Sequence, residues 1–485
     1  MEPPIHYRTA CELAGLLRSG ELGSLELLET LVARIEAFDG SLNAVVARDF
    51  ERARERARAA DAELARGAAA DRPLLGLPMT IKDTFETEGL VTACGAPELS
   101  GHVPECNADA VQRLVDAGAI VMGKTNLPLY AGDCQSFNVV YGSTNNPWDE
   151  TRTPGGSSGG AAAALAAGFT PLELGSDIGG SIRNPSHFCG VFGHKPTFGI
   201  VSDRGHIPGP PGQLAETDLN VVGPLARSAA DLEFALGLLA GPRPTGERGG
   251  WRLDLPAPRA TRPAGLRVAA WLDDPYCPVD AACLPLLEAA AGGLERAGAK
   301  VDRAARPELD FAHAYETYLM LLLPVIAAGF PPSVIELLEA AAAKLSPDDR
   351  GMPALQIRGS LVSHREWIAH DEARTRIVAA FRHFFRDFDL LLLPVHPTAA
   401  FPHDPRPDFH ARTLTVNGEQ VPYLDFLKWV SLPTLVGLPS TVAPIGRTAG
   451  GLPVGIQIVG PRFEDRTTIG AASWLGEFVP PPDFA

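Results

Sequence analysis

Two glycine-rich loops carry serines that could act as nucleophiles. The first loop, residues 155–160, contains Ser157 and Ser158 between two glycine pairs, and the second loop, residues 175–185, carries Ser181 after two glycines. A serine hydroxyl becomes a useful nucleophile only when a base removes its proton. The unhindered backbone N–H groups of glycines could stabilise a developing oxyanion. The two loops therefore suggest acyl transfer on a serine, and two structural turns are the alternative.

Lys82 is a candidate for the base, because it ends the apolar run at residues 77–81. A lysine in such a place is either paired with a carboxylate, here the adjacent Asp83, or held neutral by loss of solvent. A neutral lysine can act as general base for a serine without any histidine. The residue types alone leave both alternatives open.

Two short patterns match known motifs only formally. Residues 118–125 satisfy the phosphate-loop pattern, but their apolar variable positions predict a buried strand, and Pro128 would disturb the helix that the motif requires. Residues 156–160 satisfy the G-x-S-x-G pattern with Ser158 as nucleophile. That motif needs a buried strand in front of it, whereas residues 145–154 are polar and contain two prolines. Neither motif is predicted to function here.

The elements that must position these residues alternate along the chain. Short apolar runs bounded by glycine and proline predict strands, and periodic patterns between them predict helices. The strands are expected at residues 74–81, 119–122, 390–394 and 453–459, and the helices at 110–117, 284–297 and 366–385. This alternation predicts an α/β fold with helices on both faces of the sheet.

Three further segments have distinct patterns. Residues 1–70 are expected to be helical, starting with a capping box formed by Thr9 and Glu12. Residues 240–266 are rich in proline, glycine and arginine, as a surface connector would be, and residues 306–385 form a mostly helical region that could cap a site.

Composition argues against several classes of protein. The net charge of −16 disfavours a nucleic-acid partner. Seven dispersed cysteines without a Cys-x-x-Cys pair are typical of a reduced, cytoplasmic protein. The histidines and cysteines show no metal-ligand spacing. The longest apolar run, residues 318–330, is too short to span a bilayer and contains a proline, so no stable membrane insertion is expected.

The segment from residue 155 to residue 197 resembles the amidase signature family nearly throughout. It reads Gly-Gly-Ser-Ser-Gly-Gly, then Gly-Ser-Asp-Ile-Gly-Gly-Ser-Ile-Arg, then Gly-Val-Phe-Gly-His-Lys-Pro-Thr. Further stretches resemble the family in the same order, at residues 76–83, 123–126, 141–149, 389–394 and 451–460. The resemblance implies one amidase signature domain over residues 1–485, in which a central mixed sheet is covered by helices on both faces. Its catalytic core would comprise about residues 71–240 and 386–480.

The resemblance also implies roles for individual residues. Ser181 would be the nucleophile, Ser157 a proton relay on a cis peptide, and Lys82 the general base. The remaining implied site residues are the backbone N–H groups of Ile178, Gly179, Gly180 and Ser181 as oxyanion hole, Ser158, Asp177 and Arg183 as supports, and Ala131, Gly132, Cys134 and Gln135 in the acyl pocket.

The implied function is an amidohydrolase that cleaves a small-molecule carboxamide, or a related ester or carbamate, through an acyl-enzyme on Ser181. No cofactor and no metal are implied, and a homodimer is compatible with the resemblance. One alternative is the A subunit of a tRNA-dependent amidotransferase, ranked second because the segment after Ser202 does not resemble that subunit's shorter, serine-rich segment. Another is an inactive binding protein on the same fold, although Lys82, Ser157 and Ser181 are all retained. The sequence does not identify the substrate.

Overall fold

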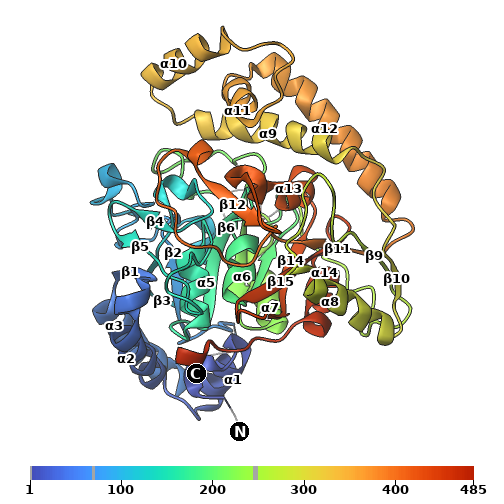
Figure 1. Cartoon of the computed structure of the whole chain (residues 1–485). Coiled ribbons are helices and arrows are strands. Elements are labelled where there is room, and N and C mark those ends of the chain that lie inside the picture. The colour runs from blue at the N-terminus through green and yellow to red at the C-terminus, as the bar shows by residue number, and fades with distance from the viewer. Residues whose placement is uncertain (1–2, 68–70, 244–249, 485) are drawn as a thin grey trace.

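The computed structural model describes residues 3–67, 71–243 and 250–484. An eleven-stranded mixed sheet runs through the molecule (Figure 1). Its strands, in spatial order, are β1 (Val45–Arg48), β3 (Ile120–Thr125), β2 (Pro78–Lys82), β6 (Leu172–Asp177), β8 (Val221–Ala226), β7 (Phe192–Lys195), β14 (Ser440–Arg447), β15 (Pro453–Val459), β11 (Leu390–Pro394), β9 (Arg267–Ala270) and β10 (Lys300–Asp302). Strand β2 is parallel to both β3 and β6, whereas β6 pairs with β8 in antiparallel fashion. Every residue of β2, β3, β6 and β8 is buried, as expected for strands covered on both faces.

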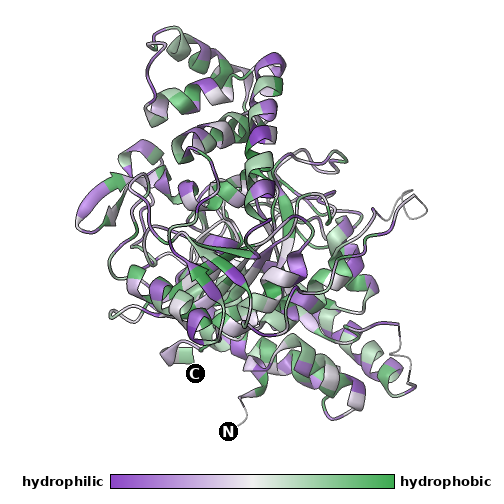
Figure 2. Cartoon of the chain, turned by 90° about the vertical axis from the view of Figure 1, so that its right-hand side faces the viewer, coloured by the Kyte–Doolittle hydropathy of each residue, from purple (hydrophilic) through white to green (hydrophobic). Residues whose placement is uncertain are grey.

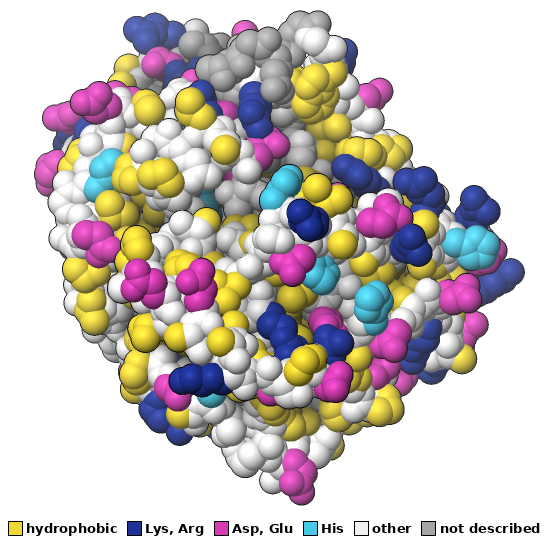
Figure 3. Space-filling model, turned by 90° about the horizontal axis from the view of Figure 1, so that it is seen from above, with side chains coloured by type: hydrophobic (Ala, Val, Ile, Leu, Met, Phe, Trp, Pro, Cys, Tyr) yellow, Lys and Arg dark blue, Asp and Glu magenta, His cyan; other side chains and the backbone are white. Residues whose placement is uncertain are grey.

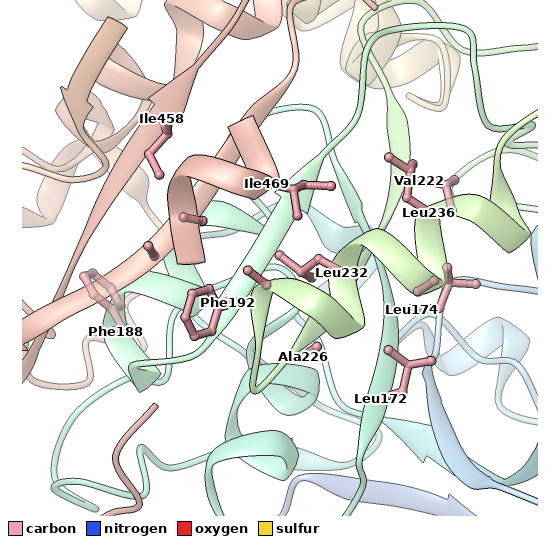
Figure 4. Packing of buried hydrophobic residues seen from close by; sticks show 14 of the residues in the cluster. Leu172, Leu174, Phe188, Phe192, Val222, Ala226, Leu232, Leu236, Ile458 and Ile469 are labelled. Carbon is pink, nitrogen blue, oxygen red and sulfur yellow. The ribbon is translucent and has the colours of Figure 1, made fainter. Parts of the chain in front are cut away.

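Helices cover both faces of the sheet. On one face, α7 (Ala229–Leu239) and α14 (Asp465–Leu475) pack over β8, β7 and β14. Figure 4 shows Leu232 and Leu236 of α7 near Leu174 and Val222. On the other face, α5 (Gly159–Ala166) and α6 (Arg183–Cys189) form a separate apolar cluster with Leu225. The predicted α/β architecture with a central mixed sheet is confirmed.

The two helices that follow the glycine-rich loops lie entirely inside the protein. All residues of α5 and α6 are buried. Helix α5 consists almost wholly of glycine and alanine, and this allows close approach of its backbone, since a Cβ on Gly160 would lie 2.4 Å from the backbone nitrogen of Asn126. Helix α6 ends at Cys189, and the next residue, Gly190, has a φ of 70°, the left-handed conformation common after helices. The loops before these helices are therefore held by their surroundings.

The remaining expectations about segments have mixed outcomes. Strands β11 and β15 have the predicted bounds, and residues 118–125 contain strand β3 instead of a phosphate loop. The capping box of Thr9 and Glu12 begins α1 (Ala10–Ser19). The expectation that residues 1–70 are helical is wrong at β1, which lies between α2 (Ser24–Leu42) and α3 (Phe50–Leu64). Strand β1 has four residues, too few for its period to be recognised in the sequence.

Four helices within residues 306–385 project from the body at the top of Figure 1. These are α9 (Phe311–Ala327), α10 (Pro332–Ala342), α11 (Met352–Ser360) and α12 (His364–Phe384), and we call them the arm. Hydrophilic and hydrophobic residues alternate along them (Figure 2).

The segment expected to be a surface connector is residues 240–266. Its described parts, residues 240–243 and 250–266, contain no further helix or strand, and residues 244–249 lie outside the described residues. Within the described ranges, no helix has both the length and the apolar character needed to cross a membrane.

Candidate active site

Lys82 lies at the carboxyl end of β2 and is completely buried. Its Nζ is 2.7 Å from Ser157 Oγ and 3.0 Å from Ser176 Oγ. Burial lowers the pKa of Lys82 to about 7. The adjacent Asp83 lies with its carboxylate 3.9 Å from Lys124 Nζ. Of the two alternatives for Lys82, the geometry therefore supports a desolvated lysine among hydroxyl groups.

Ser157 lies two residues before the start of α5 and is 1% exposed. The peptide bond between Gly156 and Ser157 is cis, as the family resemblance implies. Gly156 packs tightly against a neighbouring loop, since a Cβ there would lie 2.6 Å from the carbonyl oxygen of Asp133. Ser158 joins the two glycine-rich loops, because its N–H donates to the Ser181 carbonyl at 3.0 Å and its hydroxyl to the Ser176 carbonyl at 3.4 Å. Ser158 thus connects the first loop to the second.

Ser181 lies in the loop between β6 and α6 and is 8% exposed, more than Lys82 or Ser157. Its hydroxyl has no hydrogen-bond partner among the described residues. Asp177 and Arg183 hold this loop through a buried pair with contacts of 2.7 Å and 3.0 Å. Burial would raise the pKa of Asp177, but Arg183 beside it outweighs this effect and lowers that pKa to about 2. Asp177 therefore stays ionised and accepts several hydrogen bonds.

The backbone amides of the second loop point in different directions. The Gly180 N–H donates to Asp177 Oδ1 at 2.9 Å, so this amide, predicted for the oxyanion hole, already has a partner. The Gly180 carbonyl accepts from the Asn184 N–H at 2.7 Å. Because a trans peptide is planar, with its C=O and N–H opposed, the Ser181 N–H points away from Asn184. The N–H groups of Ile178, Gly179 and Ser181 have no hydrogen-bond partner within the described parts of the chain.

Comparison with known proteins places this arrangement in a family. The family model for amidase matches residues 26–469. The chain belongs to the amidase family. It is 33% identical to the A subunit of the glutamyl-tRNA(Gln) amidotransferase of Moorella thermoacetica over 96% of each chain.

Two solved structures share this fold. A bacterial aryl acylamidase of the amidase signature family has a TM-score of 0.81 and 25% identity, with 97% of this chain and 96% of that chain covered. A 6-aminohexanoate cyclic dimer hydrolase has a TM-score of 0.76 and 28% identity, with coverage of 98% and 97%. The fold therefore extends over almost the whole length of these relatives.

The residues expected in the acyl pocket are not equally accessible. Ala131 is half-buried and Gly132 is exposed, whereas Cys134 and Gln135 are buried. Burial raises the pKa of the Cys134 thiol well above 9, which suits a pocket wall better than a nucleophile. The Gln135 side chain accepts from the Asp404 N–H at 2.8 Å and donates to the Asp404 carbonyl at 3.0 Å. Gln135 thus holds the segment around residue 404, and its amide is not free to bind a ligand.

Two residues near the site were not predicted. Ser176 contacts Lys82 from the position before Asp177, a place in the second loop that could have been noticed. Tyr318 of α9 donates from its hydroxyl to the Ile178 carbonyl at 2.8 Å. Nothing in the sequence of residues 306–385 indicates this contact. In the described part of the chain, no group of three or more His, Cys, Asp or Glu side chains is arranged to hold a metal ion.

Proposed function

We propose that this amidase hydrolyses a small-molecule carboxamide through an acyl-enzyme on Ser181, with Ser157 as proton relay and Lys82 as general base. The observation that carries the proposal is the 2.7 Å contact between the buried Lys82 Nζ and Ser157 Oγ. A pKa of about 7 leaves much of Lys82 neutral at physiological pH, which is the form that can accept a proton.

In the acylation step, Ser181 Oγ attacks the carbonyl carbon of the amide. Its proton passes to Ser157 Oγ, which gives its own proton to the neutral Lys82. Ser157 can serve both functions because a hydroxyl is at once a donor and an acceptor. The carbonyl oxygen becomes an oxyanion, and the bond between Ser181 and the acyl carbon forms.

In the next steps the proton returns from Lys82 through Ser157 to the leaving nitrogen. The carbon–nitrogen bond then breaks and the amine departs. Water attacks the acyl-enzyme with the same two residues as proton acceptors, and the carboxylic acid is released as Ser181 regains its proton. The oxyanion is proposed to bind the N–H groups of Ile178, Gly179 and Ser181, each of which could stabilise the transition state by about 3–4 kcal/mol.

The proposal is tested by comparing two serine variants. Ser181→Ala is expected to abolish turnover, with a loss of at least ~10³-fold in kcat, because the acyl-enzyme cannot form. Ser158→Ala is the matched control and should cost much less, since its hydroxyl faces the Ser176 carbonyl. The substrates would be short and long acyl p-nitroanilides beside p-nitrophenyl esters and carbamates, which also ranks the three activities. Equal losses in the two variants would contradict the assignment.

A second candidate is the A subunit of an amidotransferase, which would release ammonia from glutamine for a partner. It is supported by the 33% identity to the amidotransferase protein of Moorella thermoacetica. Copurification with partner subunits, together with activity limited to glutamine, would favour it over an independent amidase.

For the independent amidase we propose a cytoplasmic location, because all seven cysteines are unpaired. Size-exclusion chromatography would test whether the protein forms a homodimer.

A further inference from the structure

The arm touches the proposed oxyanion hole through the side chain of Tyr318. Tyr318 lies in the middle of α9 and is completely buried. Its hydroxyl donates to the Ile178 carbonyl at 2.8 Å. Burial raises the pKa of Tyr318 above its usual value, so the hydroxyl remains protonated. Because a carbonyl oxygen can only accept, the direction of this hydrogen bond is fixed.

This hydrogen bond sets the direction of a backbone amide. The Ile178 carbonyl and the Gly179 N–H belong to one planar peptide and point in opposite directions. With the carbonyl held toward Tyr318, the Gly179 N–H is held away from the arm. Asp177 holds the next amide, that of Gly180, and Asn184 holds the Gly180 carbonyl. These two anchors come from the core, whereas the anchor of the Ile178–Gly179 peptide comes from the arm.

The space around Gly179 reinforces this arrangement. A Cβ on Gly179 would lie 2.9 Å from a methyl carbon of Leu427, which begins α13 (Leu427–Leu435), and 3.3 Å from the Tyr318 hydroxyl. The loop is therefore packed against both α9 and α13. Removal of the Tyr318 hydroxyl would leave the Ile178 carbonyl without its partner and allow the peptide to turn.

We propose that Tyr318 is a positioning residue that orients the Gly179 N–H toward the oxyanion formed on Ser181. This inference rests on the proposed acyl-enzyme mechanism. Tyr318 itself does not touch the reacting atoms, and its effect passes through the peptide that it holds. The arm thereby contributes to transition-state stabilisation, although Lys82, Ser157 and Ser181 all lie outside it.

Tyr315 provides a matched control on the same helix. It is also buried, and its ring lies 6.4 Å from that of Tyr318 between centroids. Its hydroxyl donates to the Leu424 carbonyl at 3.2 Å, away from the second loop. Tyr318→Phe and Tyr315→Phe each remove one buried hydroxyl and leave one carbonyl without that donor. Their effects on thermal stability should therefore be similar.

The test measures kcat, KM and the inhibition constant of a trifluoromethyl ketone analogue of the best substrate, which forms an oxyanion on the nucleophilic serine. Tyr318→Phe should lower kcat by on the order of tenfold, because misplaced oxyanion donors weaken transition-state binding. KM should change less than about twofold, and the inhibition constant should rise in parallel with the loss in kcat. Tyr315→Phe should leave both kcat and the inhibition constant within about twofold of the wild-type values.

Two results would overturn the inference. One is a kcat for Tyr318→Phe that equals that of Tyr315→Phe, which would mean that Tyr318 only packs. The other is a rise in KM with an unchanged inhibition constant for the ketone, which would make Tyr318 a substrate contact. Two separate measurements would show that the proposed function itself is wrong. One is that a fluorophosphonate does not label Ser181 of the wild-type chain, and the other is that Ser181→Ala retains full turnover. Either outcome would remove the basis of the inference.

Discussion

The core and the arm are stabilised in different ways. Around the site, the charged groups Asp177 and Arg183 are both completely buried and form an ion pair with each other. In the arm, α10 has no buried residue at all, and ion pairs such as Glu372–Arg376 are largely exposed. On the face seen from above, acidic and basic side chains lie among hydrophobic ones (Figure 3). The core therefore depends on particular residues at particular positions, whereas much of the arm needs only an amphipathic pattern.

This difference explains why the family resemblance is strong in the core and weak in the arm. In the core, glycines at positions such as 156 and 160 are required because a Cβ would lie less than 3.0 Å from neighbouring backbone atoms. Many different sequences can form the exposed helices of the arm, since surface substitutions usually change the free energy of unfolding by less than about 0.5 kcal/mol. Tyr318 is an exception, because it lies in the arm but contacts the core.

The largest expected effect concerns the buried lysine. Lys82→Met should reduce kcat/KM at pH 8 by roughly 10²–10⁴-fold, because it removes the general base and keeps the volume of the side chain. The same substitution at the exposed Lys344, which lies between α10 and α11 of the arm, should have no effect on activity. Steady-state kinetics on both variants tests this difference between core and arm.

The pH dependence of kcat/KM in the wild-type protein also tests the role of Lys82 as general base. Lys82 accepts a proton only when neutral, and burial lowers its pKa to about 7. Below that pH the lysine is protonated, so kcat/KM should fall about tenfold per pH unit, and above it kcat/KM should level off. A profile in Lys82→Met that still rises through pH 7 would show that another group titrates.

A second pair of variants compares the two kinds of ion pair. Arg183→Met leaves Asp177 as a buried charge without its partner and should lower the free energy of unfolding by about 3–5 kcal/mol. Arg376→Met removes a pair whose side chains are 78% and 62% exposed, and should cost about 0.3–0.5 kcal/mol. Urea denaturation measures both. Equal costs would mean that Asp177 finds another partner when Arg183 is lost.

The sequence predicts those parts of the fold that depend on local pattern. The bounds of β11 and β15 and the capping box at Thr9 follow from apolar runs and side-chain chemistry within a few residues. The contact between Lys82 and Ser157 joins residues 75 positions apart, and it was expected only from the family resemblance.

Other features could not be predicted, because they depend on the three-dimensional path of a loop or on how distant segments meet. The direction of the Gly180 amide is set by the fold of its own loop around Asp177. The side chain of Gln135 is held by Asp404, 269 residues away. Tyr318 is one of several aromatic residues in an apolar helix, and no local pattern marks the one that reaches the second loop.

The smallest expected effect lies on α10 of the arm. Leu337 is 70% exposed, so Leu337→Ala should change the free energy of unfolding by less than about 0.5 kcal/mol, given the high helix propensity of alanine. The same substitution at the completely buried Leu174 should cost about 2–5 kcal/mol through lost burial and a cavity. Urea denaturation at two protein concentrations measures both variants. A cost above about 1 kcal/mol at position 337 that grows with protein concentration would show that α10 is covered in solution, because only association makes stability depend on concentration. Helix α10 of the arm would then be buried in the associated protein, as the core is. The difference in burial between arm and core would hold only for the isolated chain.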